Sequence, residues 1–259
     1  MDLKSTNTYS PAKTIDEVLL QLDEIIAQTI DEDSYLCAFV YVYRRTTFEI
    51  KKAIEAQQFE DPPRMEKMDV MFANLFIAAF NKYQRSTITA KSWRLAFNSS
   101  GERLAIVQHI MLSMNAHINY DLPVAAASVA KGKEIIQLKN DFMKINQILA
   151  GLTDVMQKGL GKVSIFMKLL DVFGFRSDEK IINFSIKKAR DFAWLNAMEL
   201  ALLQGDVDNI RIEELDRRVV QIGNMIKNPP GKLLSFILKL ISITERKNKK
   251  IIIDKISKA

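Results

Sequence analysis

The side chains that could do chemistry in this sequence gather in residues 108–123, Gln-His-Ile-Met-Leu-Ser-Met-Asn-Ala-His-Ile-Asn-Tyr-Asp-Leu-Pro. Both histidines of the chain, His109 and His117, lie in this stretch. His117 and Asp121 are four residues apart, so a helix would place them on one face, one turn apart. A carboxylate in that position orients an imidazole ring, which suits His117 for acid–base catalysis or metal binding. The alternative is a buried His–Asp pair that ties the helix to a neighbour.

A second polar row lies beside the first on the same predicted helix. Gln108, Asn115 and Asn119 are spaced i, i+7 and i+11, which aligns them on one side at 100° per residue. Burying an unpaired polar group costs about 1–3 kcal/mol, and five such groups on one helix are more than a structural network usually needs. We therefore predict a ligand-facing site. In it His117 is the acid/base and Asp121 orients its ring, while Asn115 and Asn119 hydrogen-bond a polar group of the substrate.

The spacing of the histidines disfavours a metal site. His109 and His117 are eight residues apart, about 12 Å along an unbroken helix, so both cannot reach one ion. The sequence also lacks His-x-x-x-His and Glu-x-x-His pairs, whereas catalytic zinc and iron sites use three ligands of the His, Asp and Glu types. We predict no metal and assign no cofactor. If an ion were bound, its candidate ligands would be His117, Asp121, Asp69 and Asp141.

Motifs for a nucleophile or for phosphate binding are missing from the sequence. Cys37, the single cysteine, lies in an apolar run and is interpreted as a small core residue. No Gly-x-Ser-x-Gly motif occurs, and Gly159-Leu160-Gly161 is not a phosphate-binding loop.

The remaining sequence predicts helices that position residues 108–123. Glycine (9) and proline (6) are scarce in the 259 residues, which favours an all-α fold. Thr14 and Glu17 form a capping box for a first helix. Further helices are expected at residues 35–59, 63–83, 102–122, 177–204, 209–227 and 232–257, with another that follows a break at 131–133 and ends near 149. Glycine breaks are expected at Gly159 and Gly161. Helix 102–122 is apolar on every side apart from the two rows, so we expect it at the centre of a bundle of about eight to ten helices.

Three side chains from other elements are expected to join the site. Asp69 lies within the hydrophobic stripe of helix 63–83. Trp93 and Arg94 form an aromatic and cationic pair that we expect to close the pocket, although a core aromatic beside a paired arginine is the competing reading. The apolar surroundings indicate a hydrophobic substrate such as a lipid, terpenoid or polyketide-like molecule.

Charge and segment composition define the expected location and partners. Residues 232–259 hold eight basic residues against two acidic ones, so they carry the whole net charge of +6. A nucleic-acid-binding face would extend basic charge across the fold, and we therefore predict no nucleic-acid partner. Helix 232–257 could lie on an anionic membrane, but packing on its own domain is the favoured reading. A flexible N-terminus (1–13) and one helical domain (14–259) are expected. Without a signal-like segment or a spanning apolar run, we expect a cytoplasmic protein.

Residues 115–123 resemble the signature of an uncharacterised family of helical proteins, found in bacteria and fungi and known as a domain of unknown function. Further matches lie at residues 61–62, 68–74, 93–97, 141–142 with 146, and 190–197, and together they cover about residues 41–200. The resemblance implies an all-α single domain and implies that the motif residues are characteristic of the family, but it implies no activity. The chain departs from the family pattern at residues 89–91, where members often have prolines.

Two functions are compatible with these patterns. The first is a small-molecule-binding helical protein in which His117 and Asp121 act as an enzyme's acid/base pair. The second is a non-catalytic, structural or partner-binding protein, in which the same residues form a buried hydrogen-bond network and the basic C-terminal helix is the contact surface. The sequence does not indicate an oligomeric state.

Overall fold

The computed structural model describes residues 8–163, 186–203, 206–245 and 249–257 of the chain. Within these ranges the chain forms helices and no strand, so the prediction of an all-α bundle is confirmed. The elements are α1 (Ile15–Asp31), α2 (Leu36–Glu55), α3 (Pro62–Gln84), α4 (Lys91–Ser99), α5 (Ile106–Ala116), the π-helical turn η1 (His117–Asp121), α6 (Leu122–Val129), the 3-10 turn η2 (Gly132–Glu134), α7 (Ile135–Val163), α9 (Ile186–Leu202), α10 (Asp206–Lys227), α11 (Lys232–Thr244) and α12 (Lys249–Ser257).

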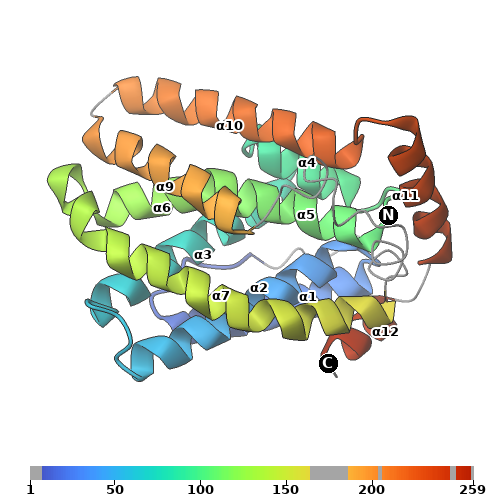
Figure 1. Cartoon of the computed structure of the whole chain (residues 1–259), viewed down its shortest axis with the longest axis horizontal. Coiled ribbons are helices and arrows are strands. Elements are labelled where there is room, and N and C mark those ends of the chain that lie inside the picture. The colour runs from blue at the N-terminus through green and yellow to red at the C-terminus, as the bar shows by residue number, and fades with distance from the viewer. Residues whose placement is uncertain (1–7, 164–185, 204–205, 246–248, 258–259) are drawn as a thin grey trace.

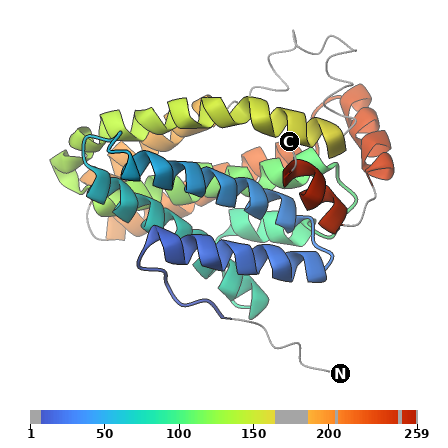
Figure 2. The same ribbon diagram turned by 90° about the horizontal axis from the view of Figure 1, so that it is seen from below.

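The elements α5, η1 and α6 run end to end through the middle of the bundle (Figure 1). Helix α5 packs against α2, α4 and α10, and α6 packs against α3 and α9. Seen from below, α2 lies between α1 and α7 (Figure 2). The central position predicted for residues 102–122 is therefore confirmed, with helices on all sides that can bury both polar rows.

A π-helical turn interrupts the central helix at the predicted site, a feature that the apolar periodicity did not indicate. Pro123 has no amide hydrogen, and in an α-helix its ring would collide with the carbonyl of Asn119. The wider turn is closed by a hydrogen bond from the Leu122 amide to the His117 carbonyl, five residues back. The chain can then continue into α6 with Pro123 in its first turn. Pro123 was expected to kink or end the helix, and here the π turn accommodates it. Such turns occur frequently at functional sites.

Helix starts follow the predicted capping signals. The Thr14 hydroxyl accepts a hydrogen bond from the Glu17 amide at 3.2 Å, as the capping box predicts. Asp61 accepts from the amide of Arg64 at 3.0 Å, and two prolines occupy the first turn of α3. Residues 8–13, expected to be flexible, instead lie against α3. Tyr9 and Ala12 of this segment are buried and donate their amides to asparagine side chains of that helix.

Several predicted boundaries differ from the structure. The central helix begins at Ile106, four residues later than expected, because residues 101–105 form a turn. Helix α7 continues through both expected glycine breaks to Val163, so those breaks are wrong. The single expected helix 232–257 is two helices, α11 and α12. The expected start of helix 177–204 lies outside the described residues, and α9 is described from Ile186 to Leu202.

Candidate functional site

His117 and Asp121 form a buried dyad on the π turn. The Nδ1 atom of His117 lies 2.9 Å from Oδ2 of Asp121, and both residues are 2% exposed. The indole Nε1–H of Trp93, on α4, donates to the same Oδ2 atom at 2.9 Å. Trp93 therefore holds the carboxyl group that orients the imidazole, a positioning role rather than the pocket-closing role expected for it.

Aromatic rings from α2 and α3 enclose the imidazole of His117. The Phe72 ring stacks on it with a centroid distance of 3.6 Å and an interplanar angle of 6°. The Tyr43 ring meets it edge-on, with centroids 4.3 Å apart and an angle of 70°. These aromatic contacts and the 2% exposed fraction of His117 keep the imidazole out of bulk solvent.

Burial shifts the pKa values of the dyad in the directions that favour two neutral groups. The pKa of His117 is lowered well below its ordinary value by burial. Burial raises the pKa of Asp121 well above its ordinary value, although the hydrogen bond from Trp93 acts in the opposite direction. Both charged forms are therefore disfavoured. One arrangement of protons that agrees with a neutral pair has the carboxyl O–H of Asp121 donating to Nδ1 and the imidazole proton on Nε2.

Polar atoms around the dyad lack hydrogen-bond partners among the described residues. They are Nε2 of His117, the hydroxyl oxygens of Tyr43 and Thr47, and Oδ2 of Asp69. All four residues are buried, with exposed fractions of 5% or less. We call Tyr43, Thr47, Asp69, Phe72, Trp93, His117 and Asp121 the His117 cluster.

Interactions among these residues place the unpartnered atoms in one region. Burial raises the pKa of the Tyr43 hydroxyl, and the Asp69 carboxylate raises it further. A side-chain hydrogen bond with the Thr47 hydroxyl acts in the opposite direction and lowers that pKa, although its geometry lies outside the limits of a normal hydrogen bond. Burial, with a smaller contribution from Glu66, raises the pKa of Asp69 to about 7. A carboxyl group that is half protonated near neutral pH can donate or accept a proton there.

Helical spacing explains how two neighbouring helices deliver these groups. Tyr43 and Thr47 are separated by one turn of α2, and Asp69 and Phe72 by three residues of α3, so each pair shares a face. The sequence analysis found Asp69 but missed Tyr43 and Thr47. The sequence pattern that could have identified Tyr43 and Thr47 is a pair of hydroxyl-bearing residues, four positions apart, on the inner face of a helix that is otherwise apolar there.

The second polar row faces a different neighbour, α10. Asn115 Nδ2 donates to the carbonyl of Val219 at 2.9 Å, and Gln108 Nε2 donates to the carbonyls of Ile226 and Lys227 at 2.9 and 3.1 Å. Asn119 Nδ2 donates to Oδ1 of Asn115 at 2.9 Å. We call Gln108, Asn115 and Asn119 the amide row. The structure does not bring the amide row together with the imidazole of His117 in any described hydrogen bond.

Helix α10 can approach the amide row closely because of a glycine. A Cβ atom at Gly223 would lie 2.7 Å from a methyl group of Leu95 and 3.3 Å from Nδ2 of Asn115. The absent side chain therefore makes room for the asparagine at the interface between α5 and α10.

Three other candidates lie away from the His117 cluster. Arg94 is exposed on α4, which corrects the expectation that it closes a pocket with Trp93. His109 stacks on Tyr35 with centroids 4.5 Å apart, in agreement with its predicted exclusion from the site. Asp141 accepts hydrogen bonds from the amides of Glu60 and Asp61 at 2.7 and 3.0 Å, which ties α7 to the start of α3.

Metal ligation finds no support in the arrangement of these side chains. Within residues 8–163 and the other described ranges, no group of three or more His, Cys, Asp or Glu side chains could hold an ion. The carboxylate of Asp141 already accepts hydrogen bonds from backbone amides at the start of α3. Cys37 is a buried free thiol, and burial raises its pKa to about 12. A thiol with so high a pKa is a poor nucleophile at neutral pH.

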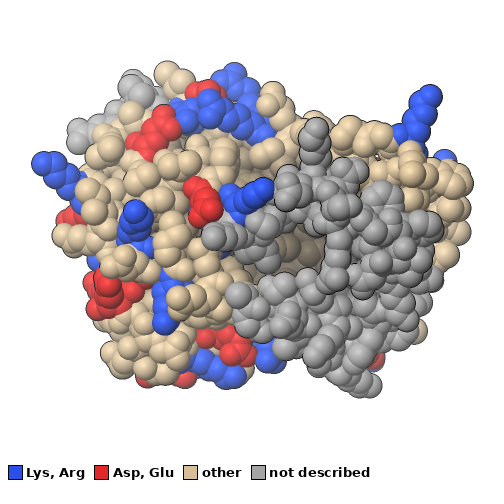
Figure 3. All heavy atoms as spheres, in the orientation of Figure 1, with Lys and Arg blue, Asp and Glu red and all other residues tan. Residues whose placement is uncertain are grey.

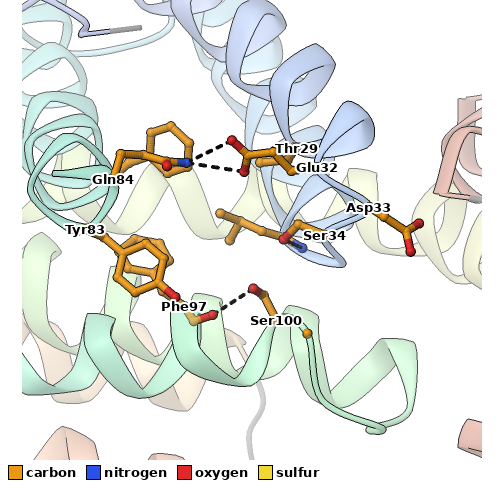
Figure 4. A pocket seen from close by; sticks show the side chains of 11 residues that line it. Thr29, Glu32, Asp33, Ser34, Tyr83, Gln84, Phe97 and Ser100 are labelled. Carbon is orange, nitrogen blue, oxygen red and sulfur yellow. Dashed lines mark hydrogen bonds between the residues drawn. The ribbon is translucent and has the colours of Figure 1, made fainter. Parts of the chain in front are cut away.

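A surface cavity of about 190 Å³ lies at the end of α1, away from the His117 cluster (Figure 4). Its lining includes Glu32, Tyr83, Gln84 and Ser100, and no member of the His117 cluster. The Gln84 amide donates to both carboxylate oxygens of Glu32 at 3.3 Å, and the Ser100 hydroxyl donates to a backbone carbonyl. Among the polar side chains that line this cavity, Glu32 and Gln84 therefore bond to each other, while the hydroxyl groups of Thr29 and Ser100 bond to backbone carbonyls.

Comparison with known proteins assigns the chain to a family. Residues 15–229 match the model described as "Family of unknown function (DUF5995)", which is most of the chain. The protein belongs to the DUF5995 family. A search of curated proteins and a search of solved structures returned no match. The matched range contains the whole His117 cluster and the amide row, while α11 and α12 follow it.

Another buried polar contact of the DUF5995 region stabilises the bundle. The guanidinium group of Arg190, on α9, lies over the ring of Phe142 at 4.3 Å and donates to the Asn146 side chain at 2.6 Å. Burial lowers the pKa of Arg190 to about 9. These contacts join α7 to α9, which favours a structural role for this arginine.

Proposed function

We propose that this DUF5995 protein binds a small, largely apolar molecule next to His117 and uses the His117–Asp121 dyad to donate a proton to that molecule or take one from it. The observation that supports the proposal is the group of four unpartnered, buried polar atoms on α2, α3 and η1. Each such atom costs about 1–3 kcal/mol when it has no partner. A ligand with a polar head would supply the missing partners.

The protonation state of the dyad defines the step that it can perform. Nε2–H of His117 donates to an oxygen of the ligand, and that proton can pass to the oxygen. The proton of Asp121 then moves to Nδ1 of His117, and the resulting carboxylate keeps the hydrogen bond from Nε1–H of Trp93. The reverse transfers return both protons, so the dyad can serve as general acid and then as general base.

The neighbouring groups suggest the class of ligand. Phe72, Tyr43 and the buried rings of Phe39 and Phe76 surround the imidazole, with ring centroids 3.6–6.0 Å away. They would contact a hydrocarbon body such as that of a lipid or terpenoid. Asp69, which was expected to join the site, has a raised pKa and would hydrogen-bond the polar end of the molecule.

The competing function, a structural or partner-binding helical protein, has support from the amide row. All donors named for Gln108, Asn115 and Asn119 meet acceptors on α10 or on each other. If the His117 cluster served the same purpose, buried water would satisfy its unpartnered atoms. The two readings differ in whether an organic molecule reaches Nε2.

A nitrogen-15 NMR experiment on histidine-labelled protein tests the proposal. Because the chain has two histidines, the spectrum holds two imidazole signal pairs, and His109 serves as an internal control. We expect a protonated Nε2 and an unprotonated Nδ1 for His117. Titration with fatty and terpenoid alcohols and acids should shift the His117 signals and leave the His109 signals in place.

Organic extraction of the purified protein, analysed by mass spectrometry, complements the NMR titration. A co-purifying apolar compound should be depleted in Tyr43→Phe, which removes one unpartnered hydroxyl, and retained in the matched variant Tyr41→Phe. If the extract contains no such compound and the whole ligand series leaves the His117 signals unchanged, the proposal is wrong.

A further inference from the structure

Helix α11 has two apolar faces, and only one of them packs against the bundle. Leu234, Leu238 and Ile241 are buried and form a small core with Ala105 of the turn before α5. A second set of large apolar side chains is exposed by 49–65%. The set, which we call the α11 stripe, comprises Leu233, Phe236, Leu240 and Ile243.

Helical geometry makes the α11 stripe a continuous surface. Its residues are spaced i, i+3, i+7 and i+10, which places all of them within about 80° of the helix circumference at 100° per residue. The thirteen residues of α11 extend for roughly 20 Å. An apolar face of this kind on an exposed helix usually marks a contact with a partner or a membrane.

Basic residues flank the α11 stripe along one edge. Lys232 and Lys239 are exposed, and at 100° per residue both lie on the same side of the stripe. The segment 232–259 carries the entire net charge of the chain. In Figure 3 the surface over α11, at the right of the view, consists of uncharged atoms from which basic side chains project.

The orientation of the α11 stripe is set by contacts at its far end. Glu245, which directly follows α11, is buried and accepts a hydrogen bond from the amide of Ile106 at 2.8 Å. This bond also caps the first turn of α5. The packed face and the Glu245 contact together keep the stripe directed away from the bundle. The DUF5995 match ends at residue 229, directly before this helix.

We propose that α11 binds the surface of an anionic lipid membrane, with the α11 stripe inserted among the acyl chains and Lys232 and Lys239 at the headgroups. An apolar stripe bordered by lysines is the pattern of helices that lie in the membrane interface. Among the described residues no helix is long and apolar enough to cross a membrane. The inference is independent of the function proposed for His117.

Vesicle co-sedimentation of the full chain tests this inference. Vesicles of phosphatidylcholine with phosphatidylglycerol should bind the protein roughly tenfold more tightly than vesicles of phosphatidylcholine alone, and high salt should remove most of that difference. The double variant Phe236→Ser/Leu240→Ser should lose binding to both. Its matched control is Leu195→Ser/Leu202→Ser, which changes two leucines of α9 that are exposed by 62% and 64%.

A second pair of variants isolates the charge. Lys232→Gln/Lys239→Gln should weaken binding to the anionic vesicles several-fold, whereas Lys67→Gln/Lys82→Gln, at exposed lysines of α3, should leave it unchanged. Equal binding to both kinds of vesicle would overturn the inference. A protein that does not bind either kind of vesicle would also overturn the inference. If Phe236→Ser then dissociates a dimer, the α11 stripe is covered by a second copy of the chain. If the protein is a monomer in which a thiol reagent fails to react with Phe236→Cys, the stripe is covered by the chain itself.

Discussion

The amide row and the His117–Asp121 dyad occupy two sides of the same buried helix, yet their hydrogen-bonding differs. On the side of α10, each side-chain donor of the amide row meets a carbonyl oxygen, including those of the last two residues of α10. Such terminal carbonyls have no partner within their own helix. On the side of α2 and α3, the dyad meets side chains, and Nε2 of His117 has no partner among the described residues.

Buried polar side chains therefore have two different roles in this protein. A side chain that satisfies a neighbouring helix end stabilises the fold, because each group would cost free energy without the other. A group of donors and acceptors that leave one another unpaired destabilises the fold unless something else binds there. The amide row fits the first description except at Oδ1 of Asn119, which has no partner among the described residues, and the His117 cluster fits the second. Removal of an unpartnered group should therefore stabilise the ligand-free protein, whereas removal of a paired group on either side of the helix should destabilise it.

The largest effect is expected for Asp121→Ala, which removes the carboxyl group that Trp93 and His117 share as a hydrogen-bond partner. Each of the two buried groups left without a partner costs about 1–3 kcal/mol, so the free energy of unfolding should fall by roughly 2–6 kcal/mol in urea denaturation. Asp31→Ala, at an exposed carboxylate of α1, should change it by less than about 0.5 kcal/mol. Equal effects in the two variants would contradict the positioning role of Asp121.

The next effect depends on pH and concerns Asp69. Its pKa is about 7 in the folded protein and 3.8 for the ordinary residue, so the folded state binds the proton more tightly. The resulting stabilisation is complete below about pH 4 and is lost as the pH rises through 7. The shift from 3.8 to about 7 makes this stabilisation about 4 kcal/mol larger at low pH than at high pH. In Asp69→Asn this pH dependence should disappear, so unfolding free energies of the two proteins should diverge from about pH 4 to pH 8. If the unfolding free energies of the two proteins changed with pH in parallel, Asp69 would not be a buried carboxyl group that is uncharged at low pH.

A smaller loss of stability is expected for Asn115→Ala in the amide row. The variant leaves the Asn119 side-chain amide without its acceptor and removes the bond to Val219. We expect a loss of about 2 kcal/mol and no change in the NMR signals of His117. The control variant is Asn98→Ala, at an exposed asparagine of α4. A change in the His117 signals would show that the two sides of the helix act together.

Sequence periodicity predicted the faces of the central helix, but it could not predict what each face meets. The four-residue spacing of His117 and Asp121 correctly indicated their contact, and the burial of Asp69 followed from its place in an apolar stripe. The partners of the amide row are backbone carbonyls, which every residue has, so no side-chain pattern indicates them. Tyr43 was missed because its ring belongs to the core pattern and only its hydroxyl group is exceptional.

Other differences have local geometric causes. Trp93 and Arg94 are adjacent in a helix, so their side chains diverge by about 100°, and in α4 this leaves Trp93 buried and Arg94 exposed. The π turn depends on the single residue Pro123, and from the sequence a proline at this position predicts a kink or a helix end as readily as a π turn. The break between α11 and α12 falls in a lysine- and arginine-rich segment with no glycine or proline, which offers no stop signal.

The smallest predicted effect has the opposite sign and distinguishes the two sides most sharply. Tyr43→Phe removes a buried hydroxyl group that has no described hydrogen-bond partner and keeps the ring that packs on His117. The ligand-free protein should therefore become more stable by about 1 kcal/mol, measured by urea denaturation after extraction of bound lipids. Tyr41→Phe, on the same helix but only partly buried, should have no such effect. A loss of stability in Tyr43→Phe would mean that its hydroxyl group is bonded in the folded protein, and the His117 cluster would then be a structural network like the amide row.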